Sequence, residues 1–465
     1  MKRFYISAIL FAFTLTSFSQ NMKYQDLGVL FSQDDNYGTA RFTAMSGAFG
    51  ALGGDISAIN INPAGLSVFN YSTFTGTLNS KNTDISASYG DASFNDRRIT
   101  TTNNLNLNLS QAGAVLVFDD IQSEDWSKFA IGFNYRITKD FSNDFSAGGN
   151  EAVTRFDSNP RDSYIYDFTN GQFFDNNYDG EISELSFAVS AVHQKKLHVG
   201  LSLNFYDLNF FQQSVLTELN SDADGNILDV ELFQDNLTTG NGFSGNLGFI
   251  YKLHKNFRFG ASYQTPTWYT EINQETNYNQ DSNIDIGDTI YYPGNEDSFT
   301  EYNDFQWINY SLRTPSKLTG SAAFIFGKNG LLSFDYTNRN YRNIKFSNGV
   351  FTNENQFYQN RLRNTHNYNI GTEWRFDNFS IRGGYNYEQT PFITNNLDND
   401  SITNFSDVEG YSFGGGYNFG VFKVDLAYTN NNRTANYNFY PGFNVDPASL
   451  NIDNRVFTAT VSISL

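Results

Sequence analysis

The chain of 465 residues contains no cysteine. This absence excludes disulfide bonds, thiol catalysis and metal sites that use cysteine ligands. An exported protein without disulfides needs another source of rigidity. Hydrogen-bonded strands that close on one another supply it, so the absence of cysteine is compatible with an all-β fold.

Long apolar runs are missing beyond the N-terminus. No window approaches the roughly 20 apolar residues of a membrane-spanning helix, so a membrane location would have to be reached with strands. At the N-terminus, Lys2 and Arg3 precede the apolar run Phe4 to Phe13, which is too short to be an anchor. The pattern predicts a secretory signal peptide over residues 1–19, cut before Gln20.

Basic residues are scarce, because 30 Lys and Arg face 49 Asp and Glu and the formal net charge is −19. Nucleic-acid binding requires basic surface, so this balance disfavours it. The His-Glu-x-x-His and phosphate-loop signatures of enzymes are also absent. We therefore expect neither an enzyme nor a nucleic-acid-binding protein, and the sequence implies no cofactor.

What the sequence does have is alternation. From Leu197 to Phe205 the odd positions are apolar and the even positions are polar or small, which gives a strand one apolar and one polar face. A soluble sandwich would alternate in the same way. The 46 Phe and 29 Tyr, the mean hydropathy of −0.46 and the long polar loops favour a transmembrane β-barrel with lipid outside and water inside.

Counting such segments predicts an antiparallel barrel of about 14 strands over residues 71–465. An opening strand at 71–79 and a closing strand at 455–465 flank six hairpins. An even number places both ends of the barrel and the short turns on the periplasmic side, and the long loops outside. The six turns are predicted near residues 119–126, 194–196, 252–256, 327–330, 375–378 and 418–421.

Residues 20–70 differ from the rest. The stretch Tyr37 to Leu66 is rich in Gly and Ala, lacks sustained alternation and closes on Asn62-Pro63-Ala64-Gly65-Leu66. It is too poor in large apolar residues to form a domain, so we predict a plug, or hatch, in the lumen. Asn62 and Pro63 suit a hatch of fixed irregular shape, since proline fixes φ and Asn can bond its own backbone. A simple turn into the first strand is the alternative.

The same residues resemble the outer-membrane long-chain fatty-acid transporter family, often called FadL/TodX-like. The chain shows that family's series of Ala40-Arg41, Gly47-Ala48-Phe49, Asp55 and Asn62 to Leu66 in order. The resemblance implies fourteen strands, an N-terminal hatch and passive diffusion of hydrophobic molecules such as fatty acids, with lateral exit through the wall. Hatch or gating residues would be Asn62, Pro63, Ala64 and Gly65. The terminal amphipathic strand resembles the signal read by the barrel assembly machinery.

Charged residues expected to face the lumen have mixed sign. In a barrel closed by a hatch we expect them to bond to one another and to the plug, as buried charges must. A basic group near the tunnel could also bind a carboxylate head group, with Arg258 and Arg382 as candidates. The expected lumen charges are Arg136, Arg258, Asp335, Arg382, Glu388, Lys423 and Asp425.

One stretch raises the question of a metal. Residues 142–180 are predicted to form a long extracellular connection, in which Asp175, Asn177 and Asp179 follow the start of a calcium-binding EF-hand loop. Ser186 stands where the loop needs a bidentate Glu, and Asp, Asn and Gly also simply make turns. Pro266 is expected at the extracellular end of its strand, where it need not interrupt the ladder.

The sequence favours an outer-membrane channel for hydrophobic molecules. Two functions of other classes stay open, because a fold does not fix a function. One is a substrate-carrying barrel associated with type IX secretion, which a member of the resembled family provides. The other is a structural or adhesive barrel whose loops bind a surface partner.

Overall fold

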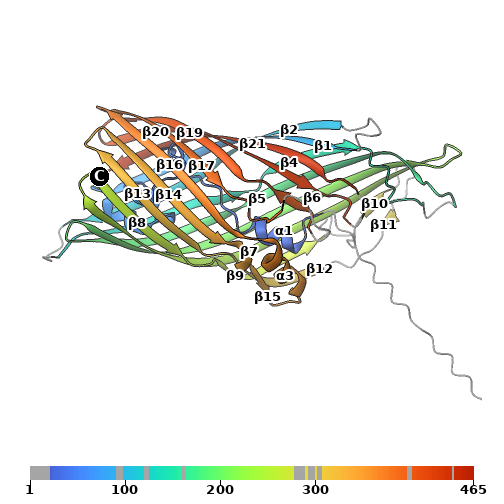
Figure 1. Ribbon diagram of the computed structural model, residues 1–465, viewed down its shortest axis with the longest axis horizontal. Helices are drawn as coiled ribbons and strands as arrows, with labels where there is room; N and C mark the ends of the chain where they lie inside the picture. Colours follow the sequence, from blue (N-terminus) through green and yellow to red (C-terminus); the bar gives the residue numbers. More distant parts are fainter. Residues whose placement is uncertain are drawn as a thin grey trace, which may run out of the picture.

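The computed structural model describes residues 21–90, 98–119, 125–159, 163–276, 289–291, 299–300, 306–394, 401–441, 443 and 445–465. The predicted signal peptide therefore lies outside the described residues. All the described strands join in a single antiparallel sheet that closes on itself, because β1 (Thr73–Tyr89) pairs with β21 (Ala448–Ser464). The result is a barrel with loops gathered at one end (Figure 1).

Fourteen wall strands make up the described barrel, which confirms the predicted fold class. Three of them consist of two collinear pieces. Between β1 and β21 the wall runs through β2 (Arg98–Phe118), β3 (Trp126–Asp140) with β4 (Asn143–Gly149), β5 (Phe168–His193), β6 (Leu197–Ser221), β7 (Ile227–His254), β8 (Phe257–Gln264) with β9 (Trp268–Thr276), β12 (Gln306–Arg313) with β13 (Lys317–Phe326), β14 (Gly330–Asn340), β16 (Asn364–Phe376), β17 (Phe379–Glu388), β19 (Val408–Asn418) and β20 (Phe422–Tyr437).

The six hairpin turns lie where the alternation predicts them. All connect neighbouring strands at the end of the barrel that also carries the start of β1 and the end of β21, here called the turn end. The opposite end, the loop end, carries the long connections. There lie β10 (Thr289–Tyr291), β11 (Phe299–Thr300), η4 (Tyr341–Asn343), β15 (Lys345–Ser347), α3 (Thr352–Arg361) and β18 (Thr403–Phe405).

The outer surface near the turn end is apolar, as the alternation predicts. Leu201, Leu203 and Phe205 are half exposed, while Ser202 and Asn204 are buried in the lumen. Aromatic residues gather at both borders of this band. Phe326 stacks on Trp374 and Phe419 on Phe422 near the turns, and Tyr336, Tyr368 and Tyr387 form a row farther toward the loop end. An apolar band between aromatic girdles is typical of a barrel that spans a membrane.

The wall is tall on one side and short on the other. β5, β6 and β7 have 26, 25 and 28 residues, whereas β17 has 10. Crossing a bilayer takes about 9–11 strand residues, so three strands extend far beyond the membrane. Residues 142–180 are consequently not one long loop, because β4 and the first half of β5 lie within them. The loop prediction was wrong there because the strands continue into the solvent.

Alternation reverses within the tall strands. Along β6 the outward residues are apolar up to Phe205, and the next outward residues are Asp207 and Asn209. The buried partners change from Asn204 to Leu208. Water replaces lipid outside the extension, and packed side chains replace a polar lumen inside it.

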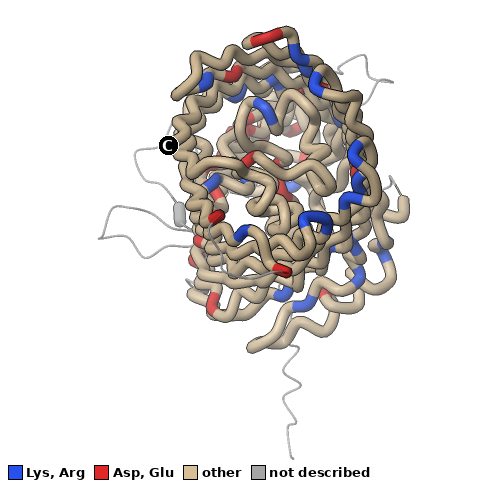
Figure 2. The backbone as a smooth tube through the Cα atoms, turned by 90° about the vertical axis from the view of Figure 1, so that its left-hand side faces the viewer, with Lys and Arg blue, Asp and Glu red and all other residues tan. Residues whose placement is uncertain are grey.

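The N-terminal segment, residues 21–70, lies inside the barrel. It holds α1 (Tyr24–Leu30), α2 (Ala40–Thr43), η1 (Ile56–Asn60) and η2 (Pro63–Val68). Figure 2, viewed from the turn end, shows chain segments crossing the ring of strands. Among the helices of the described residues, none is both long and apolar enough to cross a membrane.

Candidate functional site

The Asn62 to Gly65 motif ties the N-terminal segment to the wall. The Asn62 side chain caps η2, because its Oδ1 accepts a hydrogen bond from the Ala64 backbone N–H at 3.2 Å. Its Nδ2 donates to the Gly50 carbonyl at 2.8 Å and to the Phe249 carbonyl of β7 at 2.9 Å. Pro63 occupies the first helical position, where its missing N–H costs nothing. The motif is a capped helical turn pinned to the wall.

Small residues of the wall allow this close approach. A Cβ added at Gly200 would lie 2.3 Å from the Ala64 nitrogen and 2.4 Å from the Pro63 carbonyl carbon, and one at Gly371 would lie 2.6 Å from the Met45 carbonyl oxygen. These neighbours are backbone atoms, which cannot rotate away. Similar contacts recur on several strands, and we call this set the glycine ring: Gly132, Gly200, Gly248, Gly260, Gly371 and Gly384.

Charge pairs add a second set of attachments. Glu373 of β16 is buried. Its carboxylate accepts hydrogen bonds from Arg41 of α2 at 2.8 Å and from Arg382 of β17 at 2.6 Å. Arg382 also pairs with Asp425 at 2.8 Å. We call Arg41, Glu373, Arg382 and Asp425 the Glu373 cluster. It joins the N-terminal segment to three wall strands.

The remaining lumen charges near the turn end behave as expected for a plugged barrel. Arg258 donates to the Leu52 carbonyl at 3.1 Å. Asp335 accepts the Phe49 and Gly50 backbone N–H groups at 2.9 and 2.8 Å. Arg258 and Asp335 therefore both bond to the backbone of the N-terminal segment. A head-group role for Arg258 and Arg382 stays a prediction, and both already have partners within the protein.

Farther toward the loop end, Asp34 of the N-terminal segment lies between two cations of the wall. It bonds Lys317 of β13 and Arg339 of β14, the latter at 2.7 Å. Burial by itself would raise the pKa of Asp34, but the two cations outweigh burial and hold this pKa below its usual range. Asp34 is therefore an ionised contact between the segment and the wall.

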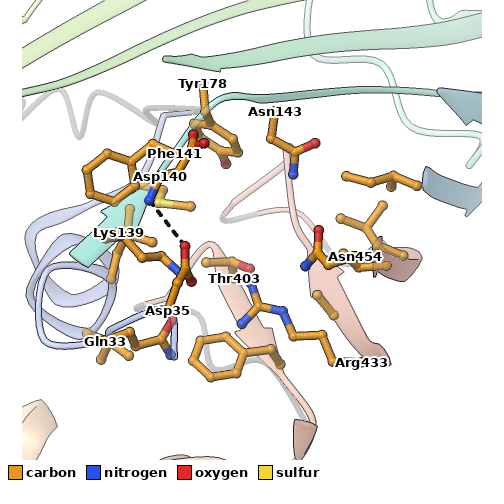
Figure 3. Close-up of a pocket in the computed structure, with 18 of the residues that line it drawn as sticks. Gln33, Asp35, Lys139, Asp140, Phe141, Asn143, Tyr178, Thr403, Arg433 and Asn454 are labelled. Atoms are coloured by element: carbon orange, nitrogen blue, oxygen red, sulfur yellow. Dashed lines mark hydrogen bonds and ion pairs between the residues drawn. The ribbon is translucent and has the colours of Figure 1, made fainter. Parts of the chain in front are cut away.

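An apolar cavity of about 120 Å³ lies above these contacts, toward the loop end. Its wall includes Ile85, Phe145, Phe210, Phe405, Tyr437 and Leu450, together with Met22 and Leu30 of the N-terminal segment. Polar side chains also line the space, and Figure 3 shows Lys139 and Arg433 reaching into it from opposite directions. A concave apolar space with a few polar groups is the usual form of a small-molecule site.

The wall beside this cavity is interrupted. β2 pairs with β3 only from Gln111 to Phe118, and residues 98–110 of β2 have no backbone partner on β3 or β4. The third wall strand breaks after Asp140, and its second piece, β4, pairs with β5. Side chains bridge the interruption: Asn108 donates to Asp140 at 2.9 Å, and Asn104 donates to the Asp144 carbonyl at 3.0 Å. We call this place the β2–β4 gap.

Cavity and gap share residues. Lys139, Asp140, Phe141, Asn143 and Phe145 of the β3–β4 junction line the cavity. The cavity therefore borders the part of the wall where side-chain bonds, and not a strand ladder, connect β2 to β4. Sequence reasoning missed this junction, and its signal is slight: Phe141-Ser142 simply interrupts an alternating run.

The calcium candidates lie in a different environment from the one predicted. Asp175, Asn177 and Asp179 belong to the continuous strand β5, where they alternate along its outer face instead of curling around an ion. Asp175 accepts from Ser146, and Asp179 accepts from Ser142 at 3.3 Å. The EF-hand reading of this stretch is wrong in its geometry, because the stretch pairs with β4 and β6 over its length.

Pro266 also departs from prediction. It lies between β8 and β9, in the middle of a wall strand, and Pro315 lies opposite it between β12 and β13. The Thr314 backbone N–H donates to the Thr267 carbonyl at 3.0 Å, and Thr267 donates back to the Thr314 hydroxyl at 3.0 Å. The two neighbouring strands are interrupted together, so neither proline faces an intact ladder on the side where these two strands adjoin.

No protein-family model and no curated protein matches the sequence. Solved structures do match the fold. A Pseudomonas aeruginosa FadL homologue is 13% identical, covers 93% of this chain and 99% of its own, and has a TM-score of 0.58. The Pseudomonas putida toluene transporter TodX is 17% identical with coverages of 93% and 99% and a TM-score of 0.51.

The Ralstonia pickettii toluene transporter TbuX is similar at 16% identity, with coverages of 91% and 98% and a TM-score of 0.51. The chain therefore has the fold of FadL- and TodX-type barrels over nearly its whole length. This confirms the resemblance at the level of the fold.

Proposed function

We propose that the protein is an outer-membrane channel for passive diffusion of hydrophobic molecules, with a hatch that keeps the lumen closed and a lateral exit at the β2–β4 gap. The observation that carries the proposal is the apolar cavity directly behind an interruption in the wall. Channels for hydrophobic compounds among the similar structures support it.

The attachments below the cavity favour a sideways route. Axial passage would require the N-terminal segment to leave the glycine ring and the Glu373 cluster, which breaks buried ion pairs. Opening the β2–β4 gap requires only that amide and hydroxyl donors of β2 exchange their hydrogen-bond acceptors. A hydrophobic solute that leaves sideways enters lipid without crossing water, which is the unfavourable step. Asn62, Pro63, Ala64 and Gly65 accordingly hold the hatch and do not bind the solute.

The size of the cavity bears on the solute. An apolar cavity of about 150 Å³ in another protein accommodates benzene, so the 120 Å³ space has the volume of a single ring or a short stretch of alkyl chain. A long-chain fatty acid would fill it and extend beyond it through the gap. We place aromatic hydrocarbons and fatty acids in the same class of candidate solutes, those that need an apolar tunnel.

A crosslink across the gap tests the route. The chain has no cysteine, so Asn104→Cys/Asn143→Cys creates one pair, at side chains that bond at 3.2 Å. The matched control Ser86→Cys/Thr101→Cys joins β1 to β2 beside the gap, where the two hydroxyls lie 3.2 Å apart in register. Uptake of a fluorescent fatty acid and of toluene is measured in liposomes that hold the refolded barrels, before and after reduction.

We expect the oxidised gap variant to lose at least about 90% of the uptake above empty liposomes and to recover it on reduction, because a disulfide cannot open. The control variant should keep its uptake in both states. Full uptake through the oxidised gap would contradict lateral exit. Wild-type uptake equal to empty liposomes would contradict the channel itself and favour the secretion or adhesion alternatives.

A further inference from the structure

Exposed lysines gather along one arc of the turn end. The β5–β6, β7–β8 and β13–β14 turns follow one another around the wall, and their residues 193–198, 252–258 and 324–330 contain no Asp or Glu. Four of their five lysines are exposed, and Lys252 is half-buried. We call these side chains the lysine row: Lys195, Lys196, Lys252, Lys255 and Lys328.

Backbone hydrogen bonds hold the three turns side by side. The Lys252 N–H donates to the Lys196 carbonyl at 2.9 Å, and the Ile325 N–H donates to the Asn256 carbonyl at 2.8 Å. The ladders of β6 with β7 and of β8 with β13 lead directly to these bonds. The lysines therefore form one continuous surface on a rigid part of the wall.

Acidic side chains do not offset this surface. Among the residues that the structure describes, no carboxylate forms an ion pair with a member of the lysine row. Asp125 of the neighbouring β2–β3 turn accepts instead from Gln194, at 3.4 Å. Farther along the turn end, Lys423 is paired with Asp425 at 2.9 Å. The lysine row is thus a positive surface on a chain whose formal net charge is −19.

The lysine row adjoins the apolar outer band. Leu253, the next residue after Lys252, is 60% exposed, and Phe324 and Phe326 of β13 are about half exposed. Lysine stems cover apolar surface while the ammonium groups stay in water. The row therefore lies at the level where lipid tails give way to head groups.

We infer that the lysine row binds the phosphate head groups of anionic phospholipids in the leaflet on the periplasmic side. Clusters of four or more basic residues at a membrane surface are typical of binding to anionic lipid, and a phosphate accepts strong hydrogen bonds from ammonium groups. The adjoining apolar band favours lipid over an acidic protein as the partner. Such binding requires the barrel to lie in a membrane and does not depend on the passage of solutes.

Lipid binding to the refolded barrel in micelles of an uncharged detergent tests this inference. Native mass spectrometry follows the titration with dioctanoyl phosphatidylglycerol, with the zwitterionic dioctanoyl phosphatidylcholine and with inorganic phosphate. The variant is Lys195→Gln/Lys255→Gln. The matched control is Arg313→Gln/Lys345→Gln, which removes two exposed cations that lie opposite each other on β12 and β15 at the loop end. Heat-modifiable gel mobility verifies that all barrels are folded.

We expect Lys195→Gln/Lys255→Gln to weaken binding of phosphatidylglycerol by about tenfold and to leave the weaker binding of phosphatidylcholine unchanged. The control should match wild type, and about 0.5 M salt should abolish the difference between the two lipids. Equal losses in variant and control, or no loss in the variant, would overturn the inference.

Two competitors separate lipid from other anions. Inorganic phosphate that displaces phosphatidylglycerol at equal concentration would show an anion site with no preference for lipid, and would overturn the inference. A polyglutamate peptide is the probe for an acidic protein. If the variant lost the peptide and kept the lipid, the row would belong to a protein partner instead.

Discussion

The two halves of the lumen have opposite designs. Near the turn end, the N-terminal segment packs backbone against the glycine ring and its charges are paired, as in the Glu373 cluster. Toward the loop end the segment borders an apolar cavity, and the ladder of the wall is interrupted beside it. In the function proposed above, the satisfied contacts near the turn end keep the lumen closed, and the open apolar space toward the loop end receives the solute.

Breaking the Glu373 cluster should have the largest effect. Glu373→Ala removes the carboxylate that accepts hydrogen bonds from Arg41, Arg375 and Arg382. Buried Arg41 then loses its ion pair, and Arg382 keeps only its ion pair with Asp425. We expect a loss of about 3–5 kcal/mol in the free energy of unfolding, as for other broken buried pairs. Urea unfolding in detergent measures it, with the exposed Glu409→Ala as control. A loss below about 1 kcal/mol would show that the cluster does not hold the seal.

Overpacking the glycine ring should have a smaller effect on stability and a specific effect on the seal. In Gly200→Val the new side chain collides with the backbone of Pro63 and Ala64, so we expect a loss of about 1–3 kcal/mol. Because the hatch must move, ion conductance in planar bilayers should rise above that of wild type. Gly320→Val is the control, since nothing lies within 4 Å of that position. Unchanged conductance would contradict the gating role of residues 62–65.

The smallest expected effect is a dependence of stability on pH in the acidic range. The pKa of Asp34 lies below its ordinary value of 3.8, so its contribution to stability is complete above that pH and disappears as the pH falls further. Between about pH 4 and pH 2, wild type should lose stability more steeply than Asp34→Asn, which is already less stable at neutral pH. The exposed Asp224→Asn serves as control. If the free energy of unfolding of wild type and Asp34→Asn fell equally steeply with pH, Asp34 would not contribute to holding the segment in the lumen.

Much of the wall could be read from the sequence. The strand count, the six turns and the outward face of strands such as Leu197 to Phe205 follow from a period of two and from turn residues, which are local properties. The reversal at Phe205 and Asp207 even marks where lipid gives way to water. Prediction failed where strands continued past that border, because the loop-like composition of residues 168–180 does not prevent pairing with the long strand β6.

The site was less accessible to prediction. Arg258 and Arg382 were predicted from their inward parity, but parity does not reveal that Leu52 and Glu373 already accept from them. Such partners lie far apart in the chain, and only the closed barrel brings them near.

The sequence by itself determined that this chain forms a closed antiparallel barrel with an apolar outer band and a small-residue segment ahead of it, because alternation and composition act locally. Only the tertiary structure decided which charges are satisfied, where the ladder is interrupted and where an apolar space remains. Each of these depends on how the N-terminal segment fits the lumen, and that fit is a property of long-range contacts that no local pattern encodes.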